Sequence, residues 1–237
     1  MKLGVNVDHI ATLRNARRGS EPDVIEGVRT AIKAGCDSIV CHLRVDRRHI
    51  KDEDVYTIRK IVSIPMNLEA SLDNEIIKIA LDLKPDIITI VPEKREEITT
   101  EGGLNLIKNQ KKLNKVIPLL KDKKIIVSLF IDPEKESIKL SKDIGADSVE
   151  LHTGCYANAV GPSIEKEFNR IKESAYFVKE LGLYCAAGHG LNYNNTKKIV
   201  SIKEIEELNI GHSIISQSIF IGLENAIKKM KNIIAQN

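Results

Sequence analysis

The residues of this chain best suited to chemistry are its histidines, which stand at one position of a repeated pattern. His42, His152 and His189 each follow a glycine by seven residues, at the end of a short apolar run. Runs of this kind, bounded by turn signals, are typical of buried strands. Each imidazole would therefore lie at the carboxyl end of a strand, where it can transfer a proton near neutral pH. The other histidines fall at or just past such a run, or in the loop after one: His9, His212 and His49.

Carboxylates occupy the same strand ends. Residues two apart along a strand share a face, so Glu150 would lie beside His152. A carboxylate inside an apolar strand is costly to bury without a partner or a function. Glu69 ends another apolar run, and we expect a raised pKa that suits a general base. The same alternation places further polar residues on shared faces: Asn6 with Asp8, and Asn67 with Glu69.

Two groups of residues could bind phosphate. Residues 187–190 and 209–213 combine glycine with histidine after the last two strands, and the second segment runs into a helix. Backbone N–H groups of glycines and of helix N-termini bind anions. The other group is basic and follows the first two strands: Arg14, Arg17, Arg44, Arg47, Arg48 and His49. Since guanidinium groups suit phosphate, these residues predict an enzyme that joins two phosphorylated small molecules.

Eight strand-like runs must position these groups. We expect strands over residues 3–8, 38–43, 65–69, 86–91, 125–130, 148–151, 183–187 and 208–211, with helical patterns between them. Apolar strands that alternate with helices imply a parallel sheet covered by helices. Eight such units in 237 residues predict an α/β fold, a (β/α)8 TIM barrel that forms a single domain over residues 1–237 with extra helices. An open doubly wound sheet is the alternative. In a barrel, the active site lies at the carboxyl ends of the strands.

Local signals add detail to this expectation. Gly35, Gly145 and Gly182 should each end a helix before the chain turns into the next strand. Asp132 followed by Pro133 predicts the start of a helix. Residues 93–124 exceed what one helix needs, so we expect an extra helix or a mobile loop there, with residues 99–103 in the loop.

Composition excludes several classes of protein. The net charge is +3, and the lysines are spread over helical patterns, which disfavours a nucleic-acid partner. No apolar run approaches the roughly 18 residues of a membrane span, and the N-terminus enters a strand pattern at once. We therefore expect a cytoplasmic protein without a membrane partner. The four cysteines form no CxxC pair, which favours reduced thiols over disulfides or a zinc site.

These motifs, taken in order along the whole chain, resemble those of the pyridoxine 5′-phosphate synthase family. The matching segments are residues 4–17 (GVNVDHIATLRNAR), 42–49 (HLRVDRRH), 66–69 (MNLE), 91–95 (VPEKR), 99–103 (TTEGG), 152–156 (HTGCY), 188–190 (GHG) and 208–212 (LNIGH). The resemblance implies a barrel that condenses 1-deoxy-D-xylulose 5-phosphate with 3-amino-2-oxopropyl phosphate. The product would be pyridoxine 5′-phosphate, released with inorganic phosphate and water. The resemblance also implies a transferase-class enzyme that assembles as a cytoplasmic homo-octamer and needs no metal or organic cofactor.

The resemblance also implies a role for each of several individual residues. His42 and Glu69 would accept protons, His189 would donate one, and Glu150 would stabilise a transition state. Two further sets would bind the substrates. The set for the aminoketone phosphate is Asn6, Arg17, Gly190, Gly211 and His212, and the set for the deoxyxylulose phosphate is Asp8, His9, Arg44, His49 and Thr99.

Two positions depart from the family pattern, and two other functions remain open. Val45 stands where the family has Glu, and Ala186 stands where it has Asn. The first rival function is a metal-dependent sugar-phosphate aldolase or epimerase, because His and carboxylates at strand ends can bind a divalent ion. The second is a phosphometabolite sensor without catalysis, which would need the anion sites but gain nothing from Glu69 and His42.

Overall fold

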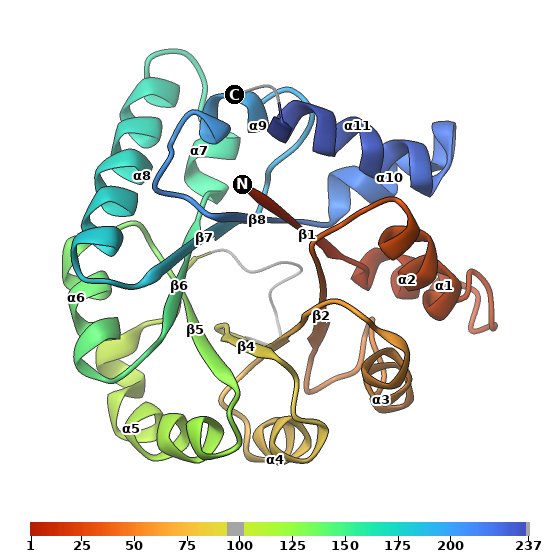
Figure 1. Cartoon of the computed structure of the whole chain (residues 1–237), viewed down its shortest axis with the longest axis horizontal. Coiled ribbons are helices and arrows are strands. Elements are labelled where there is room, and N and C mark those ends of the chain that lie inside the picture. Colours follow the sequence, from red (N-terminus) through yellow and green to blue (C-terminus); the bar gives the residue numbers. More distant parts are fainter. Residues whose placement is uncertain (94–101, 236–237) are drawn as a thin grey trace.

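The computed structural model, which describes residues 1–93 and 102–235, is a closed barrel of eight parallel strands (Figure 1). Each strand pairs with the next along the chain, and β1 also pairs with β8, so no sheet edge is left. The (β/α)8 prediction is confirmed, and the open sheet is excluded. The strands are β1 Lys2–Asn6, β2 Ser38–Leu43, β3 Met66–Ala70, β4 Ile87–Ile90, β5 Ile126–Ile131, β6 Ser148–His152, β7 Tyr184–Gly188 and β8 Glu207–Ile210.

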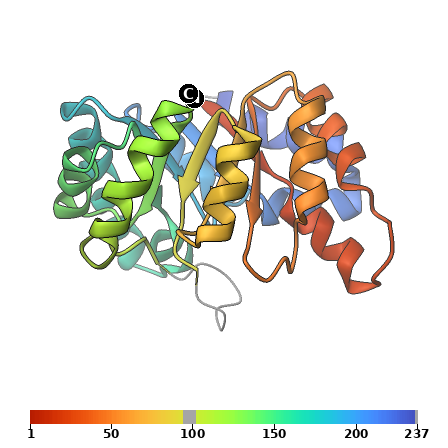
Figure 2. The ribbon, with the colours of Figure 1, turned by 90° about the horizontal axis from the view of Figure 1, so that it is seen from below.

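Helices surround the strands on the outside, as the side view in Figure 2 shows. Extra helices beyond one per strand follow β1, β6 and β8, which agrees with the expectation of a barrel with additional helices. The described helices are α1 Asp8–Ala16, α2 Val24–Lys33, α3 Asp52–Ile61, α4 Asn74–Leu83, α5 Leu106–Asp122, α6 Lys135–Asp143, α7 Gly154–Asn158, α8 Ser163–Glu180, α9 Thr196–Val200, α10 His212–Ile221 and α11 Leu223–Ala235.

Turn chemistry ends the helices where the sequence predicts. Gly35, Gly145 and Gly182 have φ values of 86°, 89° and 68°, in the left-handed region that glycine reaches without a steric penalty. Each directly precedes the segment that leads into β2, β6 or β7. At the other end of α2, the Asp23 side chain accepts a hydrogen bond from the Ile25 N–H and caps the helix.

Polar side chains fill part of the barrel interior. The Ser38 hydroxyl of β2 donates to the Glu207 carboxylate of β8 over 2.6 Å, although β1 lies between these strands. This contact passes over Gly4 of β1, where a Cβ would lie 2.8 Å from the Ser38 hydroxyl oxygen. The Thr89 hydroxyl donates to the Asn67 side-chain oxygen over 2.9 Å, and all four polar side chains are buried. The interior is thus held by satisfied hydrogen bonds as well as by apolar packing.

Two predicted boundaries differ from the structure by two residues or more, and the other predicted strand ends agree to within one. Strand β1 ends at Asn6, so Asp8 is not a strand residue but the first residue of α1. The helix predicted to start at Asp132 starts instead at Lys135, with Glu134 as its N-cap. The Asp132 side chain lies 3.1 Å from the His152 ring nitrogen Nδ1. The carboxylate therefore contacts an imidazole at the end of the neighbouring strand β6 rather than capping the helix.

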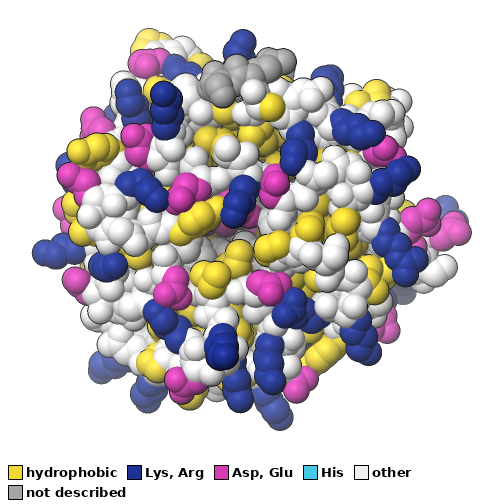
Figure 3. All heavy atoms as spheres, in the orientation of Figure 1, with side chains coloured by type: hydrophobic (Ala, Val, Ile, Leu, Met, Phe, Trp, Pro, Cys, Tyr) yellow, Lys and Arg dark blue, Asp and Glu magenta, His cyan; other side chains and the backbone are white. Residues whose placement is uncertain are grey.

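The surface carries both signs of charge. On the face drawn in Figure 3, Lys and Arg side chains are interspersed with Asp and Glu. Large apolar side chains are also exposed, including Ile219 and Phe220 at the end of α10, which are 67% and 81% exposed. None of the helices within residues 1–93 and 102–235 is long and apolar enough to cross a membrane.

A buried ion pair fastens α1 to α3. Both Arg14 terminal nitrogens donate to the Asp54 carboxylate, over 2.7 and 2.8 Å, and both side chains are buried. The adjacent Asn15 amide donates to the backbone carbonyls of Arg48 and His49 over 3.1 and 2.7 Å. These contacts hold the loop after β2 against α1.

We expect Asp54→Ala to lower the free energy of unfolding by about 3–5 kcal/mol, because it leaves the Arg14 guanidinium buried without its carboxylate. Urea unfolding followed by circular dichroism measures this loss. The matched control is Lys33→Ala, which breaks an ion pair whose Lys33 side chain is 74% exposed, and it should leave the unfolding midpoint unchanged. Equal midpoints for the two variants would contradict the assignment.

Candidate active site

A cavity of about 410 Å³ opens at the carboxyl ends of the strands. The TIM-barrel geometry predicts this position, because the loops after the strands converge there. Of the fourteen residues that the sequence predicts for the site, twelve line this cavity: Asn6, Asp8, His9, His42, Arg44, His49, Glu69, Glu150, His189, Gly190, Gly211 and His212. The structure therefore brings them together, although their individual roles stay predictions.

The remaining two predicted residues are Arg17 and Thr99. Arg17 follows α1, is exposed and does not line the cavity. Thr99 lies outside the residues that the structure describes. Residues 99–101 of the loop predicted over residues 99–103 lie outside the described part of the chain in the same way.

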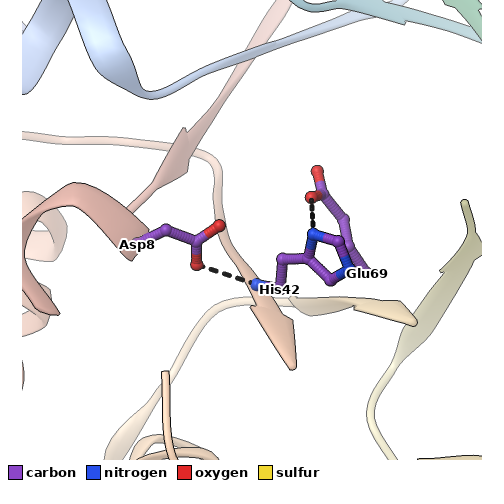
Figure 4. Close-up of side chains that lie close together, drawn as sticks. All are labelled: Asp8, His42 and Glu69. Atoms are coloured by element: carbon purple, nitrogen blue, oxygen red, sulfur yellow. Dashed lines mark hydrogen bonds and ion pairs between the residues drawn. The ribbon is translucent and has the colours of Figure 1, made fainter. Parts of the chain in front are cut away.

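The centre of the site is a group formed by Asp8, His42 and Glu69 (Figure 4). His42 and Glu69 are direct partners in the register of β2 and β3, and His42 Nδ1 lies 3.8 Å from Glu69 Oε2. The His42 backbone N–H donates to Asp8 Oδ1 over 2.8 Å, and the Asn6 amide donates to Asp8 Oδ2 over 3.0 Å. Asp8 thus connects the end of β1 to the end of β2.

Burial changes the acid–base properties of this group. It raises the pKa of the Glu69 carboxyl well above its usual range, and the nearby charges of Glu150 and Asp8 raise it further. Burial likewise raises the pKa values of Asp8 and Glu150. It lowers the pKa of His42 to about 3, and the Arg44 charge acts in the same direction. The site therefore combines carboxyl groups whose raised pKa suits proton transfer near neutral pH with an imidazole that burial keeps neutral.

The same three residues could also offer ligands to a cation. One ligand atom from each of Asp8, His42 and Glu69 lies within 4.8 Å of the others. Both Asp8 oxygens, however, already accept hydrogen bonds, and the positive charge of Arg44 acts on both Asp8 and His42. A cation would have to displace these hydrogen bonds and oppose that charge. The sequence-based prediction of no metal stays a prediction, which chelation can test.

Glu150 forms the opposite side of the cavity. Its carboxylate is buried and accepts a hydrogen bond from the Asn209 amide of β8 over 2.6 Å. A Cβ at Gly188 would lie 2.4 Å from Glu150 Oε1, so only glycine leaves room for this carboxylate. The sequence-based site prediction omitted Asn209. Its position two residues before Gly211, within the strand predicted over residues 208–211, is the signal that could have identified it.

Three histidines gather on the β1 and β8 side of the cavity. The His9 ring centroid lies 5.0 Å from that of His212 and 6.0 Å from that of His49. Burial lowers the pKa of His9 to about 4, and the charges of His212 and His49 lower it further. His212 begins α10, with Gly211 as the N-cap. The cluster therefore places imidazoles beside the N-terminus of a helix, a combination that suits an anion.

The arginines divide into one cavity residue and several structural residues. Arg44 is buried and lines the cavity, with its Nε 3.7 Å from Asp46 and 3.9 Å from Glu93. Arg14, which the sequence placed in a basic anion site, instead binds Asp54. Arg47 bonds Asp52 and Glu75. The basic group is thus smaller than predicted, because neighbouring carboxylates engage Arg14, Arg47 and Arg48.

The two departures from the family pattern are accommodated locally. Val45 is partly buried against the apolar core, and its backbone N–H donates to Glu93 Oε1 over 2.9 Å. Ala186 is buried and pairs with Glu150 in the register of β6 and β7. Neither side chain lines the cavity.

His189 lines the cavity beside Gly190, in the loop after β7. Burial lowers the pKa of its imidazole to about 4, and the charge of His152 acts in the same direction. His152 itself is buried at the end of β6 and does not line the cavity.

Comparisons with known proteins agree with this architecture. A thiamine phosphate pyrophosphorylase from Pyrococcus furiosus superposes with a TM-score of 0.65 at 15% identity, over 98% of this chain and 95% of that one. This likeness concerns the fold.

Two relatives carry the name pyridoxine 5′-phosphate synthase. The protein from Sulfurihydrogenibium sp. (strain YO3AOP1) is 55% identical over 99% of this chain and 98% of its own. That from Thermodesulfovibrio yellowstonii is 52% identical over 99% and 97%.

The family described as "Pyridoxal phosphate biosynthesis protein PdxJ" matches residues 3–236. Because this match and the two relatives span nearly the whole chain, the protein belongs to the PdxJ family of pyridoxal phosphate biosynthesis proteins.

Proposed function

We propose that this protein is a pyridoxine 5′-phosphate synthase, a transferase-class enzyme. It would condense 1-deoxy-D-xylulose 5-phosphate with 3-amino-2-oxopropyl phosphate to pyridoxine 5′-phosphate, inorganic phosphate and water. The observation that carries the proposal is the 50–55% identity, over nearly complete chains, to relatives of that name. The grouping of twelve predicted site residues around one cavity supports it.

The substrates would be bound through their phosphates at two places. Arg44 and the adjacent His9 and His49 suit the deoxyxylulose phosphate, together with Asp8 and Thr99. Gly190, Gly211 and His212 suit the aminoketone phosphate, together with Asn6 and Arg17. The assignments of Thr99 and Arg17 rest on the family resemblance alone. Imidazoles that burial keeps neutral would gain protons when a phosphate arrives, because a nearby negative charge raises their pKa.

The reaction needs several proton transfers in one pocket. The amine of one substrate attacks the ketone of the other, and loss of water gives an imine. Ring closure then requires removal of protons from carbons next to carbonyl or imine groups. Glu69 and His42, 3.8 Å apart, are placed to accept these protons, and His189 would return one to a leaving oxygen. A carboxyl group with a raised pKa is a strong base once it is ionised.

Glu150 has a separate role in this proposal. Its buried carboxylate, oriented by the Asn209 amide, would stabilise positive charge that develops on the condensing nitrogen in the transition state. A preorganised charge in a water-poor site acts more strongly than it would in water.

We also propose a domain organisation, a cellular location and an assembly for the protein. The whole chain, residues 1–237, would act as one domain, in the cytoplasm, with no nucleic-acid or membrane partner and no cofactor. It would assemble as a homo-octamer. The exposed Ile219 and Phe220 side chains on α10 support burial against another copy.

The first prediction concerns product and metal together. Purified protein given both phosphorylated substrates should form pyridoxine 5′-phosphate and inorganic phosphate. The rate in excess EDTA should equal the rate without EDTA, because Arg44 and the hydrogen-bonded oxygens of Asp8 oppose the binding of a cation. Product is measured by chromatography with fluorescence detection. Loss of turnover that zinc or manganese restores would overturn the prediction that the enzyme needs no metal. Tight binding of both substrates without turnover would support the sensor.

The second prediction concerns the general base. Glu69→Gln keeps the size and hydrogen bonding of the side chain but cannot accept a proton, so turnover should fall by roughly 10²–10⁴ while substrate binding survives. Single-turnover kinetics and calorimetric titration separate the two effects. As a control, Glu75→Gln changes an exposed glutamate of α4 and should keep full activity. Near wild-type turnover in Glu69→Gln would make Glu69 a structural carboxylate.

The third prediction concerns Arg44. Arg44→Ala should weaken apparent affinity for one phosphorylated substrate by about 1.5–3 kcal/mol, the usual contribution of a charge-assisted hydrogen bond. The KM values of both substrates provide the measurement. Arg170→Ala, which removes a surface guanidinium from α8, serves as the control. Unchanged KM values for both substrates would show that Arg44 does not bind a substrate phosphate.

A further inference from the structure

The segment His152–Thr153–Gly154 has no part in the chemistry proposed above, yet it packs against His189. His189 has φ 79°, in a left-handed region that residues with side chains rarely adopt, and Gly190 follows with φ 77°. Such a conformation persists only where surrounding contacts impose it. The contacts that hold His189 are therefore part of how the site is built.

Thr153 holds the backbone on one side of His189. Its side chain is fully buried, and its hydroxyl oxygen lies 2.8 Å from the Gly188 carbonyl oxygen and 2.6 Å from that of His189. The Thr153 backbone N–H also donates to the Gly188 carbonyl, over 2.9 Å. A hydroxyl has one proton to donate. Since the Gly188 carbonyl already has a donor, the closer His189 carbonyl is the favoured acceptor of the hydroxyl proton.

His152 holds the imidazole of His189. The two ring centroids lie 5.1 Å apart at an interplanar angle of 54°. A Cβ at Gly154 would lie 2.4 Å from His152 Nε2 and 3.2 Å from His189 Cδ2. The absence of a side chain at Gly154 therefore allows the rings to approach each other.

Asp132 fixes the orientation of the His152 ring. His152 Nδ1 lies 3.1 Å from Asp132 Oδ1, and this contact lowers the pKa of the carboxyl group, which stays ionised as an acceptor. An ionised carboxylate orients the Nδ1–H of an imidazole and selects its tautomer. Asp132 also accepts a hydrogen bond from the Gly103 backbone N–H, so it is itself held in place.

We propose that Asp132, His152 and Thr153 are positioning residues for His189: Thr153 fixes its strained backbone, and the Asp132-bound ring of His152 fixes the direction of its imidazole. The kinetic consequence rests on the proposed function, in which His189 donates a proton. A proton donor that is displaced by a fraction of an ångström slows the chemical step more than it weakens binding.

The main test is Thr153→Val, which keeps the shape and the backbone N–H but removes the hydroxyl. We expect kcat to fall at least about 10-fold while the KM of each substrate changes less than about twofold. Thr153→Ser restores the hydroxyl and should recover kcat to within about threefold of wild type. Ser141→Ala is the matched control, because it removes a fully buried hydroxyl that donates to the Ser137 carbonyl in α6, and it should keep wild-type kcat.

A second variant tests the proposal if Thr153→Val folds poorly. Crystal structures test it if the protein proves inactive. Asp132→Ala changes a side chain that is 38% exposed, and it should also lower kcat selectively. Crystal structures of both variants should show His189 with an altered φ or a rotated ring. If His189 is unmoved in both, the proposal is overturned. If wild-type protein makes no pyridoxine phosphate, the proposed function fails, whereas the structures still decide the positioning role.

Discussion

Parallel pairing between β2 and β3 is the constraint on which the site depends. It places His42 directly opposite Glu69, so a base and a carboxyl group meet without any contribution from a loop. Closure of the barrel through β1 and β8 then brings Asp8 and Asn209 to the same rim. Because backbone hydrogen bonds fix this register, the reacting groups are positioned by the most rigid part of the fold.

Burying three carboxyl groups around one cavity is energetically costly, and the structure shows how the cost is reduced. Asp8 accepts two hydrogen bonds, Glu150 accepts one from Asn209, and Arg44 supplies a positive charge nearby. Glu69 keeps 17% of its side chain exposed, through the cavity. Burial still raises the pKa of each of the three carboxyl groups, a perturbation typical of groups that transfer protons.

Scaffolding residues and site residues share the same short motifs. In the stretch before Arg17, Asp8 and His9 line the cavity, whereas Arg14 and Asn15 bind α3 and the loop after β2. The HTGCY segment is divided in a similar way, since Thr153 bonds the backbone of His189 while His152 packs against its ring. A residue in such a motif can therefore support a catalytic neighbour without touching a substrate.

The sequence by itself determined the barrel and most of the cavity lining. Helix-ending glycines such as Gly145, apolar strands and a polar residue at each strand end repeat with a fixed order, and parallel strands must bring those ends to one rim. Only the tertiary structure decided how individual side chains are used. Arg14 looked like a phosphate ligand but binds Asp54, and Asp132 looked like a helix cap but binds His152. Their partners lie 40 and 20 residues away, and no local pattern encodes contacts at that separation.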